Sequence, residues 1–130
     1  MTIQERADLA ADYKRSGKCN CCQAVTKVLA DTVSTDEEDL MQLTSAFAAG
    51  MGCMEATCGA LIGACMVAGL KSQGKGSPRL AKEILTNFKE KSGATICKDL
   101  KGIGSGKVLC ECNDCVKNAV YAYGQVMNLD

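Results

Sequence analysis

The sequence predicts an all-α fold, a single-domain helical bundle of about five or six helices over residues 1–130. Apolar residues recur at spacings of three and four, whereas no run alternates in the manner of a strand. Residue patterns typical of helix caps precede these stretches, and glycines or the single proline separate them. A chain of 130 residues is long enough to bury one core.

The first part of the chain contains three predicted helices. A capping box at Thr2–Glu5 begins the first, which ends at Ser16-Gly17. Asn20 caps the second, CCQAVTKVLAD, whose apolar residues form one stripe. Residues 35–38, TDEE, form another predicted capping box and begin a third helix that extends to Gly50-Met51-Gly52.

The fourth predicted helix is the least polar part of the chain, ATCGALIGACMVAGL (56–70), with Thr57 as its cap. Its apolar run from Cys58 to Leu70 has 13 residues between Glu55 and Lys71. A membrane span needs about 20 residues, so we predict a buried core helix and no membrane span. Small residues on this helix, Gly59 and Gly63 among them, would let neighbouring elements approach closely.

The remaining elements follow the loop SQGKGSP. Ser77 as cap and Pro78 at the first helical position begin a fifth helix, which Gly93 ends. Thr95 caps a short turn that holds Cys97. A last helix extends from Cys112 to about residue 127.

The composition excludes several classes of function. The net charge is zero and only 4% of residues are aromatic, so we expect no nucleic-acid binding. The absence of histidine excludes imidazole ligation of haem, mixed Cys/His zinc sites and every nucleophile that depends on a histidine base. The N-terminal residues lack the pattern of a signal peptide, and we therefore expect a cytoplasmic location.

The ten cysteines are the dominant feature of the sequence. In the cytoplasm thiols are normally kept reduced, so this number indicates metal ligation or redox chemistry rather than a disulfide scaffold. Thiols occur at the predicted N-terminal ends of four separate helices, where unpaired N–H groups favour a thiolate. These thiols are Cys21 with Cys22, Cys58, Cys97 and Cys112.

The spacing of the cysteines fits neither of two compact metal-binding patterns, the paired zinc knuckle and the ferredoxin motif. The groups at 19–22 and 112–115 lie far apart in sequence, unlike paired zinc knuckles, and ferredoxin spacings are absent. Cys112 and Cys115 form a CxxC whose two sulfurs share one side of a helix. A metal or redox site in this chain would therefore be assembled from helices that are distant in sequence.

At these residues the sequence resembles the C_GCAxxG_C_C family of redox-active proteins. NCCQAV (20–25) is similar to the family's NCAQAV, which assigns its first cysteine to Cys21. FAAGMGCMEATCGALIGACMVAGL (47–70) is similar to its GGGMG and CGAxxG segments and assigns the second cysteine to Cys58. TICKDL supplies Cys97, and a C-x-x-x-V pattern supplies Cys112.

This family in turn has a distant resemblance to the iron–sulfur-bearing part of split-Soret cytochromes c. That resemblance implies a cluster held by the thiolates of Cys21, Cys58, Cys97 and Cys112, with a [2Fe–2S] centre as one form. The chain contains no CxxCH motif, so the resemblance does not extend to the haem of those cytochromes. Six further cysteines leave the ligand assignment open, because Cys115 or Cys22 could replace a neighbour.

Three functions are consistent with these thiols. The first is an iron–sulfur protein for electron transfer or sensing, working with a redox partner protein. The second is a metal-free thiol–disulfide oxidoreductase or redox sensor in which Cys58, Cys112 and Cys115 are catalytic, through a CxxC or a Cys21–Cys58 pair. The third is binding of zinc or copper(I). Association into a homodimer is compatible with each, and the sequence does not decide whether the protein is an enzyme.

Overall fold

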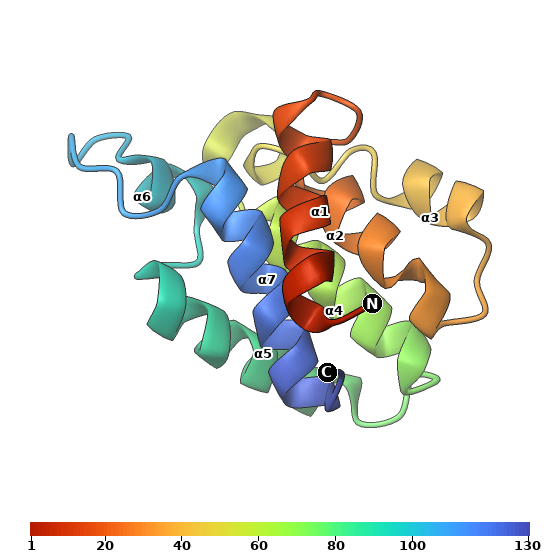
Figure 1. Cartoon of the computed structure of the whole chain (residues 1–130). Coiled ribbons are helices and arrows are strands. Elements are labelled where there is room, and N and C mark those ends of the chain that lie inside the picture. Colours follow the sequence, from red (N-terminus) through yellow and green to blue (C-terminus); the bar gives the residue numbers. More distant parts are fainter.

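The computed structural model describes all 130 residues, and it confirms the all-α class, since no strand is formed. It contains seven α-helices, more than the five or six predicted, because the short turn at Cys97 closes into a helix of its own. A 3₁₀ turn and a π-type turn complete the structure (Figure 1). The elements are α1 (Ile3–Arg15), α2 (Cys21–Leu29), η1 (Ala30–Thr32), α3 (Glu37–Leu43), η2 (Gly50–Met54), α4 (Gly59–Lys71), α5 (Ser77–Ser92), α6 (Cys97–Lys101) and α7 (Cys112–Met127).

The first two predicted helix starts are confirmed. The hydroxyl of Thr2 accepts from the N–H of Glu5 at 3.1 Å, and the Glu5 carboxylate accepts from the Thr2 N–H at 3.1 Å. The Asn20 side chain accepts from the Gln23 N–H at 2.8 Å in the same reciprocal arrangement. These bonds satisfy amide groups that have no partner within the helix.

The third predicted helix is wrong at both ends. It begins after Asp36 without a side-chain capping bond, so the capping box at residues 35–38 does not form. It ends at Leu43 rather than near Gly50. There the Thr44 hydroxyl donates to the Leu40 carbonyl at 2.6 Å, and the chain then leaves the helical path. Local hydrogen bonding of this kind competes with helix continuation.

Three further predicted caps are each displaced by one residue. α4 begins after Cys58 rather than Thr57, α6 after Ile96 rather than Thr95, and α5 after Gly76, which places Ser77 inside the helix. Gly93 ends α5 in the left-handed conformation, with φ of 93°, as predicted. The displacement matters at α4, because the cysteine itself becomes the capping residue.

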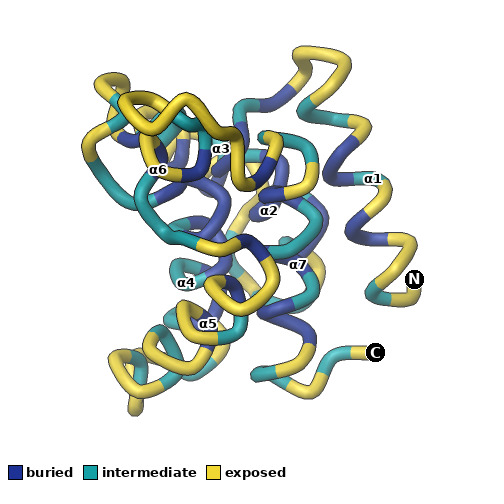
Figure 2. The backbone as a smooth tube through the Cα atoms, turned by 90° about the vertical axis from the view of Figure 1, so that its left-hand side faces the viewer, coloured by how far each residue is buried: buried dark blue, intermediate teal, exposed yellow.

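Five of the helices form the bundle. α1 packs on α7 and α2, α4 packs on α2, α7 and α5, and α5 also packs on α7. α3 lies on α2, whereas α6 contacts η2 and projects with the following loop at the left of Figure 1. The inner faces of the bundle are buried, and the loop after α6 is exposed (Figure 2). None of the helices combines the length and apolar character that crossing a membrane requires.

Two glycines allow α4 to lie directly against α2 and its surroundings. A Cβ atom at Gly63 would stand 2.8 Å from the carbonyl oxygen of Cys22 and 3.3 Å from its sulfur. A Cβ atom at Gly59 would stand 2.1 Å from the carbonyl oxygen of Phe47 and 2.7 Å from the sulfur of Cys21. Real Cβ atoms cannot occupy either position, so the CGAxxG glycines are required by helix packing.

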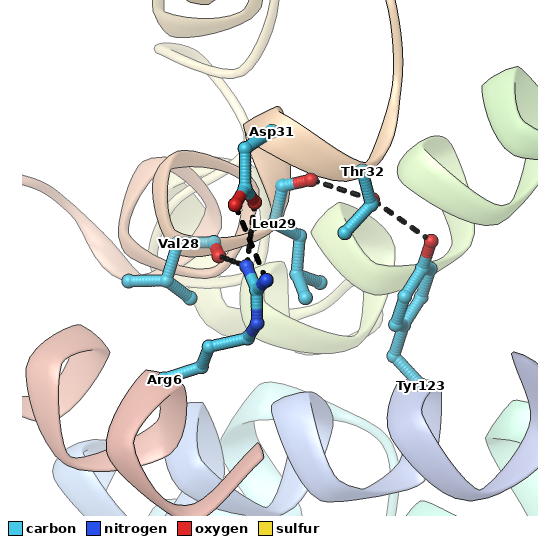
Figure 3. A network of polar contacts seen from close by, with 6 residues as sticks. All are labelled: Arg6, Val28, Leu29, Asp31, Thr32 and Tyr123. Atoms are coloured by element: carbon cyan, nitrogen blue, oxygen red, sulfur yellow. Dashed lines mark hydrogen bonds and ion pairs between the residues drawn. The ribbon is translucent and has the colours of Figure 1, made fainter. Parts of the chain in front are cut away.

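A buried arginine joins α1 to the end of α2 on the side of the bundle drawn in Figure 3. The Arg6 guanidinium donates to the Val28 carbonyl at 2.5 Å and to both carboxylate oxygens of Asp31 at 2.6 and 3.2 Å. It thereby satisfies a carbonyl in the last turn of α2. Nearby, the Thr32 hydroxyl bonds the Tyr123 hydroxyl at 3.2 Å and so connects η1 to α7.

We expect Gly63→Ala to lower the free energy of unfolding by about 1–3 kcal/mol, because the added methyl group overpacks the contact with α2. Urea unfolding of the reduced, metal-free protein measures this change. Gly69→Ala is the matched control on the same helix, since no atom lies within 4 Å of its added Cβ. The free energy of unfolding of that variant should rise by about 0.5–1 kcal/mol, because alanine has a higher helix propensity than glycine. Equal effects of the two substitutions would contradict the packing role of Gly63.

Candidate functional site

One cavity collects the thiols that the sequence placed at helix ends. Cys21, Cys58, Cys97 and Cys112 all line it, and Cys115 joins them. Its volume is about 110 Å³, enough for several water molecules. The remaining lining residues are Lys14, Asn20, Ala48, Ala49, Gly59, Leu100 and Lys101.

The expectation that four helices each present a sulfur at their N-terminal end is confirmed. Cys21, Cys97 and Cys112 are the first residues of α2, α6 and α7, and Cys58 is the capping residue of α4. Free N–H groups at such ends favour a negatively charged sulfur. α6 has only five residues, so its contribution is the smallest of the four.

A single antiparallel bridge aligns two of these cysteines. Thr57 and Ile96, the residues directly before Cys58 and Cys97, pair with each other. The N–H of Cys58 donates to the Thr95 carbonyl at 2.8 Å, and the N–H of Cys97 donates to the Ala56 carbonyl at 3.0 Å. The bridge therefore fixes α6 beside the start of α4, although the two cysteines are 39 residues apart (97 − 58).

The turn η2 supplies the wall next to this bridge. Ala49, Gly50 and Met51 have positive φ values of 51°, 57° and 65°, a left-handed run that ordinary residues adopt at a cost of about 1–2 kcal/mol each. At Gly50 a Cβ atom would stand 2.6 Å from the Cβ atom of Cys97. The Ala49 N–H points at the Cys21 sulfur. The strained turn thus brings backbone up against two of the thiols.

Burial raises the pKa of a thiol whereas a helix N-terminus lowers it, and the balance differs among the thiols of the cavity. Burial raises the pKa of Cys21 and of Cys97 above the ordinary thiol value. The pKa of Cys58 is instead lowered to about 7, chiefly because the Cys115 thiol hydrogen-bonds to its sulfur. The N–H groups at the start of α4 and the nearby Lys101 also lower this pKa. At Cys21 and Cys97, burial therefore outweighs the helix ends, and the thiolate that their positions favour is not stabilised in the free protein.

Lys101 is a cavity residue that the sequence interpretation missed. Its ammonium group bonds the Cys112 sulfur, and this bond is the main cause of its raised pKa. Cys97 and Cys21 raise it further, so the cation lies near these three thiols as well as near Cys58. The available signal was its position four residues after Cys97, on the same face of α6.

The other cysteines do not line this cavity. Cys22 is fully buried beneath Gly63, and burial raises its pKa to about 12. Cys65 lies in an apolar groove between α4 and α5, and burial raises its pKa to about 11. Cys53 is exposed in η2. The CxxC pair, Cys112 and Cys115, does share one side of α7 toward the cavity.

The candidate metal ligands of the cavity are thiol sulfurs. No three cysteine, aspartate or glutamate side chains converge closely enough to hold one metal ion. A cluster places its iron and sulfide atoms between its ligands, so its thiolates lie further apart than those of one ion. Thiolate-only donors around an enclosed space are the ligands that such clusters use.

The fold and this cavity define a class, an all-α protein with a buried chamber of thiols from separate helices. The family model described as "Putative redox-active protein (C_GCAxxG_C_C)" matches residues 19–126, and the chain belongs to this family. Membership supports a redox role for the protein. No curated protein and no solved structure matches the chain.

In the reduced, metal-free protein we expect Cys58 to ionise with a midpoint near pH 7. Because its pKa is lowered, the thiolate is present above pH 7 and is lost as the pH falls through that value. Alkylation rates at Cys58 between pH 5.5 and 9, read by peptide mass spectrometry, measure the midpoint; ordinary thiols titrate near about 8.5.

Cys115→Ala provides the matched comparison for this measurement. It removes the hydrogen-bond donor to the Cys58 sulfur, so the alkylation midpoint should move to higher pH. An unchanged midpoint in this variant would show that Cys115 does not acidify Cys58.

Proposed function

We propose that the chain is an iron–sulfur protein for electron transfer or redox sensing, with Cys21, Cys58, Cys97 and Cys112 as ligands of the cluster. The supporting observation is that four thiols from four helix ends line one cavity. A bound cluster of this type, with [2Fe–2S] as one form, supplies one-electron transfer. The family's redox role agrees with this proposal.

The residues around the thiols have separate tasks in this proposal. The N–H groups at the starts of α2, α4 and α7 stabilise negative charge on the sulfurs. Lys101 supplies the compensating positive charge beside Cys112. Ala48, Ala49 and Gly59 form an apolar wall that limits access of water. Hydrogen bonds, charge and solvent exposure at the sulfurs are the factors that set a cluster's reduction potential.

Electrons would pass at the edge of the cavity formed by Cys112. This is the one half-buried thiol among the four proposed ligands, and Lys14 and Lys101 line the cavity with it. A redox partner protein with an acidic surface would match these charges. We place this activity in the cytoplasm, where free thiols remain reduced. A second copy of the chain is a further candidate partner.

A metal-free thiol–disulfide oxidoreductase is the second candidate. Cys58 has a pKa of about 7, and the Cys115 thiol hydrogen-bonds to it. An acidified thiol with a second thiol at hand is the arrangement that disulfide exchange needs. Cys58 would attack, and Cys115 or Cys112 would resolve the mixed disulfide. Zinc or copper(I) binding is distinguished from both by the metal content.

We expect protein reconstituted with iron and sulfide in the absence of oxygen to absorb visible light and to contain iron and acid-labile sulfide. Serine substitution of Cys21, Cys58, Cys97 or Cys112 should abolish or strongly reduce that content, because each removes one ligand. Elemental analysis and absorption spectra measure both. Cys53→Ser is the control, since this thiol is exposed and lies outside the cavity.

Colourless protein without iron after this treatment would refute the cluster. Retention of full iron content in all four variants would refute the ligand assignment. Stoichiometric zinc or copper in protein that takes up no iron would instead identify the third function.

Lys101→Gln should lower the reduction potential of the reconstituted protein by tens of millivolts, because it removes a positive charge that stabilises the more negative reduced form. Potentiometric titration followed by absorption measures the shift. Lys98→Gln makes the same change of charge on α6 at an exposed position outside the cavity. Equal shifts in the two variants would contradict a local role for Lys101.

A further inference from the structure

A second group of polar contacts lies on the other side of Cys115, away from the cavity. Cys110 lines a surface cleft of about 510 Å³ between the loop after α6 and α7. The Cys115 thiol is within hydrogen-bonding reach of both the Cys110 sulfur and the Cys58 sulfur. Cys115 therefore forms the partition between an open cleft and the thiol cavity.

The sulfur of Cys110 is surrounded by hydrogen-bond donors. The Asn118 amide nitrogen lies 3.7 Å from it, and the hydroxyl of the buried Ser92 bonds to it. Asn118 also donates to the Ser92 oxygen at 2.9 Å, which holds both groups in place. Donors converging on a sulfur stabilise its thiolate form, the nucleophile in disulfide exchange.

The backbone geometry also holds Cys115 against Cys110. The Cys115 thiol donates to the Cys110 carbonyl oxygen at 3.6 Å, so its sulfur lies beside the residue with which it would pair. Formation of an S–S bond between the two side chains requires movement of Cys110, which lies in the loop before α7 rather than in a helix.

We propose that Cys110 and Cys115 form a reversible dithiol–disulfide pair that exchanges with disulfides entering the surface cleft. The substrate class is a small disulfide such as oxidised glutathione. This site is additional to the cluster site, since Cys110 does not line the thiol cavity. The proposal does not depend on the proposed function, because the exchange involves no metal.

The exchange proceeds in two balanced steps. The Cys110 thiolate attacks one sulfur of the external disulfide, forming a mixed disulfide and releasing the other half as a thiolate, which takes up a proton. Cys115 then loses its proton and attacks the Cys110 sulfur, releasing the second half as a thiol. Two protein thiols are oxidised to one disulfide, and one external disulfide is reduced to two thiols.

Oxidation of this pair would also alter the thiol cavity. In the disulfide, Cys115 no longer carries the proton that it donates to Cys58. The loss of a hydrogen bond to a ligand sulfur changes the potential of a bound cluster. Oxidation of the pair by external disulfides would thus change the reduction potential of a cluster bound in the cavity.

The test uses the full chain, reduced and free of metal, in glutathione buffers of increasing oxidised fraction. After acid quenching, free thiols are alkylated with iodoacetamide, and reduced disulfides are then labelled with N-ethylmaleimide. Trypsin releases VLCECNDCVK (108–117), which carries Cys110, Cys112 and Cys115 in one peptide. Fragmentation assigns the label on each cysteine, and intact mass separates an internal disulfide from bound glutathione.

We expect maleimide on Cys110 and Cys115 with iodoacetamide on Cys112. In Cys110→Ala the label on Cys115 should disappear, whereas Cys53→Ala, at an exposed thiol of η2, should leave the pair unchanged. Circular dichroism shows that the variants are folded.

A label on Cys115 that persists in Cys110→Ala, or one paired with Cys58 or Cys112 in the unsubstituted chain, would overturn the proposal. Thiols that stay free at both positions while Cys53 becomes glutathionylated would also overturn it. Because no iron is present, none of these outcomes depends on whether the protein binds a cluster.

Discussion

The contact of α4 with the start of α2 determines the positions of the other elements. Gly59 and Gly63 lie directly against backbone and sulfur atoms of their neighbours, at distances that no side chain would permit. This contact brings Cys58 and Cys21 to the same cavity and holds the carbonyl of Phe47 against α4. The strained turn η2 and the bridge to α6 follow from it, because the chain must turn sharply between Phe47 and Cys58.

The acidity of the thiols results from two opposing effects in this small space. Helix ends favour thiolates by about 0.3–1 kcal/mol each, whereas burial disfavours them. Burial is the larger effect for Cys21 and Cys97. Cys58 differs because a neighbouring thiol supplies a hydrogen bond as well. In a cluster the iron would replace these protons, so a high pKa in the free protein is compatible with a ligand role.

The parts of the structure that depend on local interactions could be predicted from the sequence. The capping box at Thr2, the cap at Asn20 and the placement of cysteines at helix starts involve contacts within four residues. The contacts between distant segments could not be predicted. The left-handed turn at 49–52, the Thr57–Ile96 bridge and the proximity of Cys110 to Cys115 arise only when helices pack. The early end of α3 is a local feature, with the Thr44 hydroxyl bonded to the Leu40 carbonyl, but the spacing of apolar residues does not reveal it.

The four cavity thiols belong to helices that are synthesised one after another, from Cys21 to Cys112. During translation the chamber therefore lacks a wall until α7 has been made and has docked on α1 and α4. Until then Cys21, Cys58 and Cys97 are thiols of an incomplete protein, open to oxidants and to stray metal ions. In the cell, the nascent chain therefore depends on a reducing environment until α7 has been made and has docked.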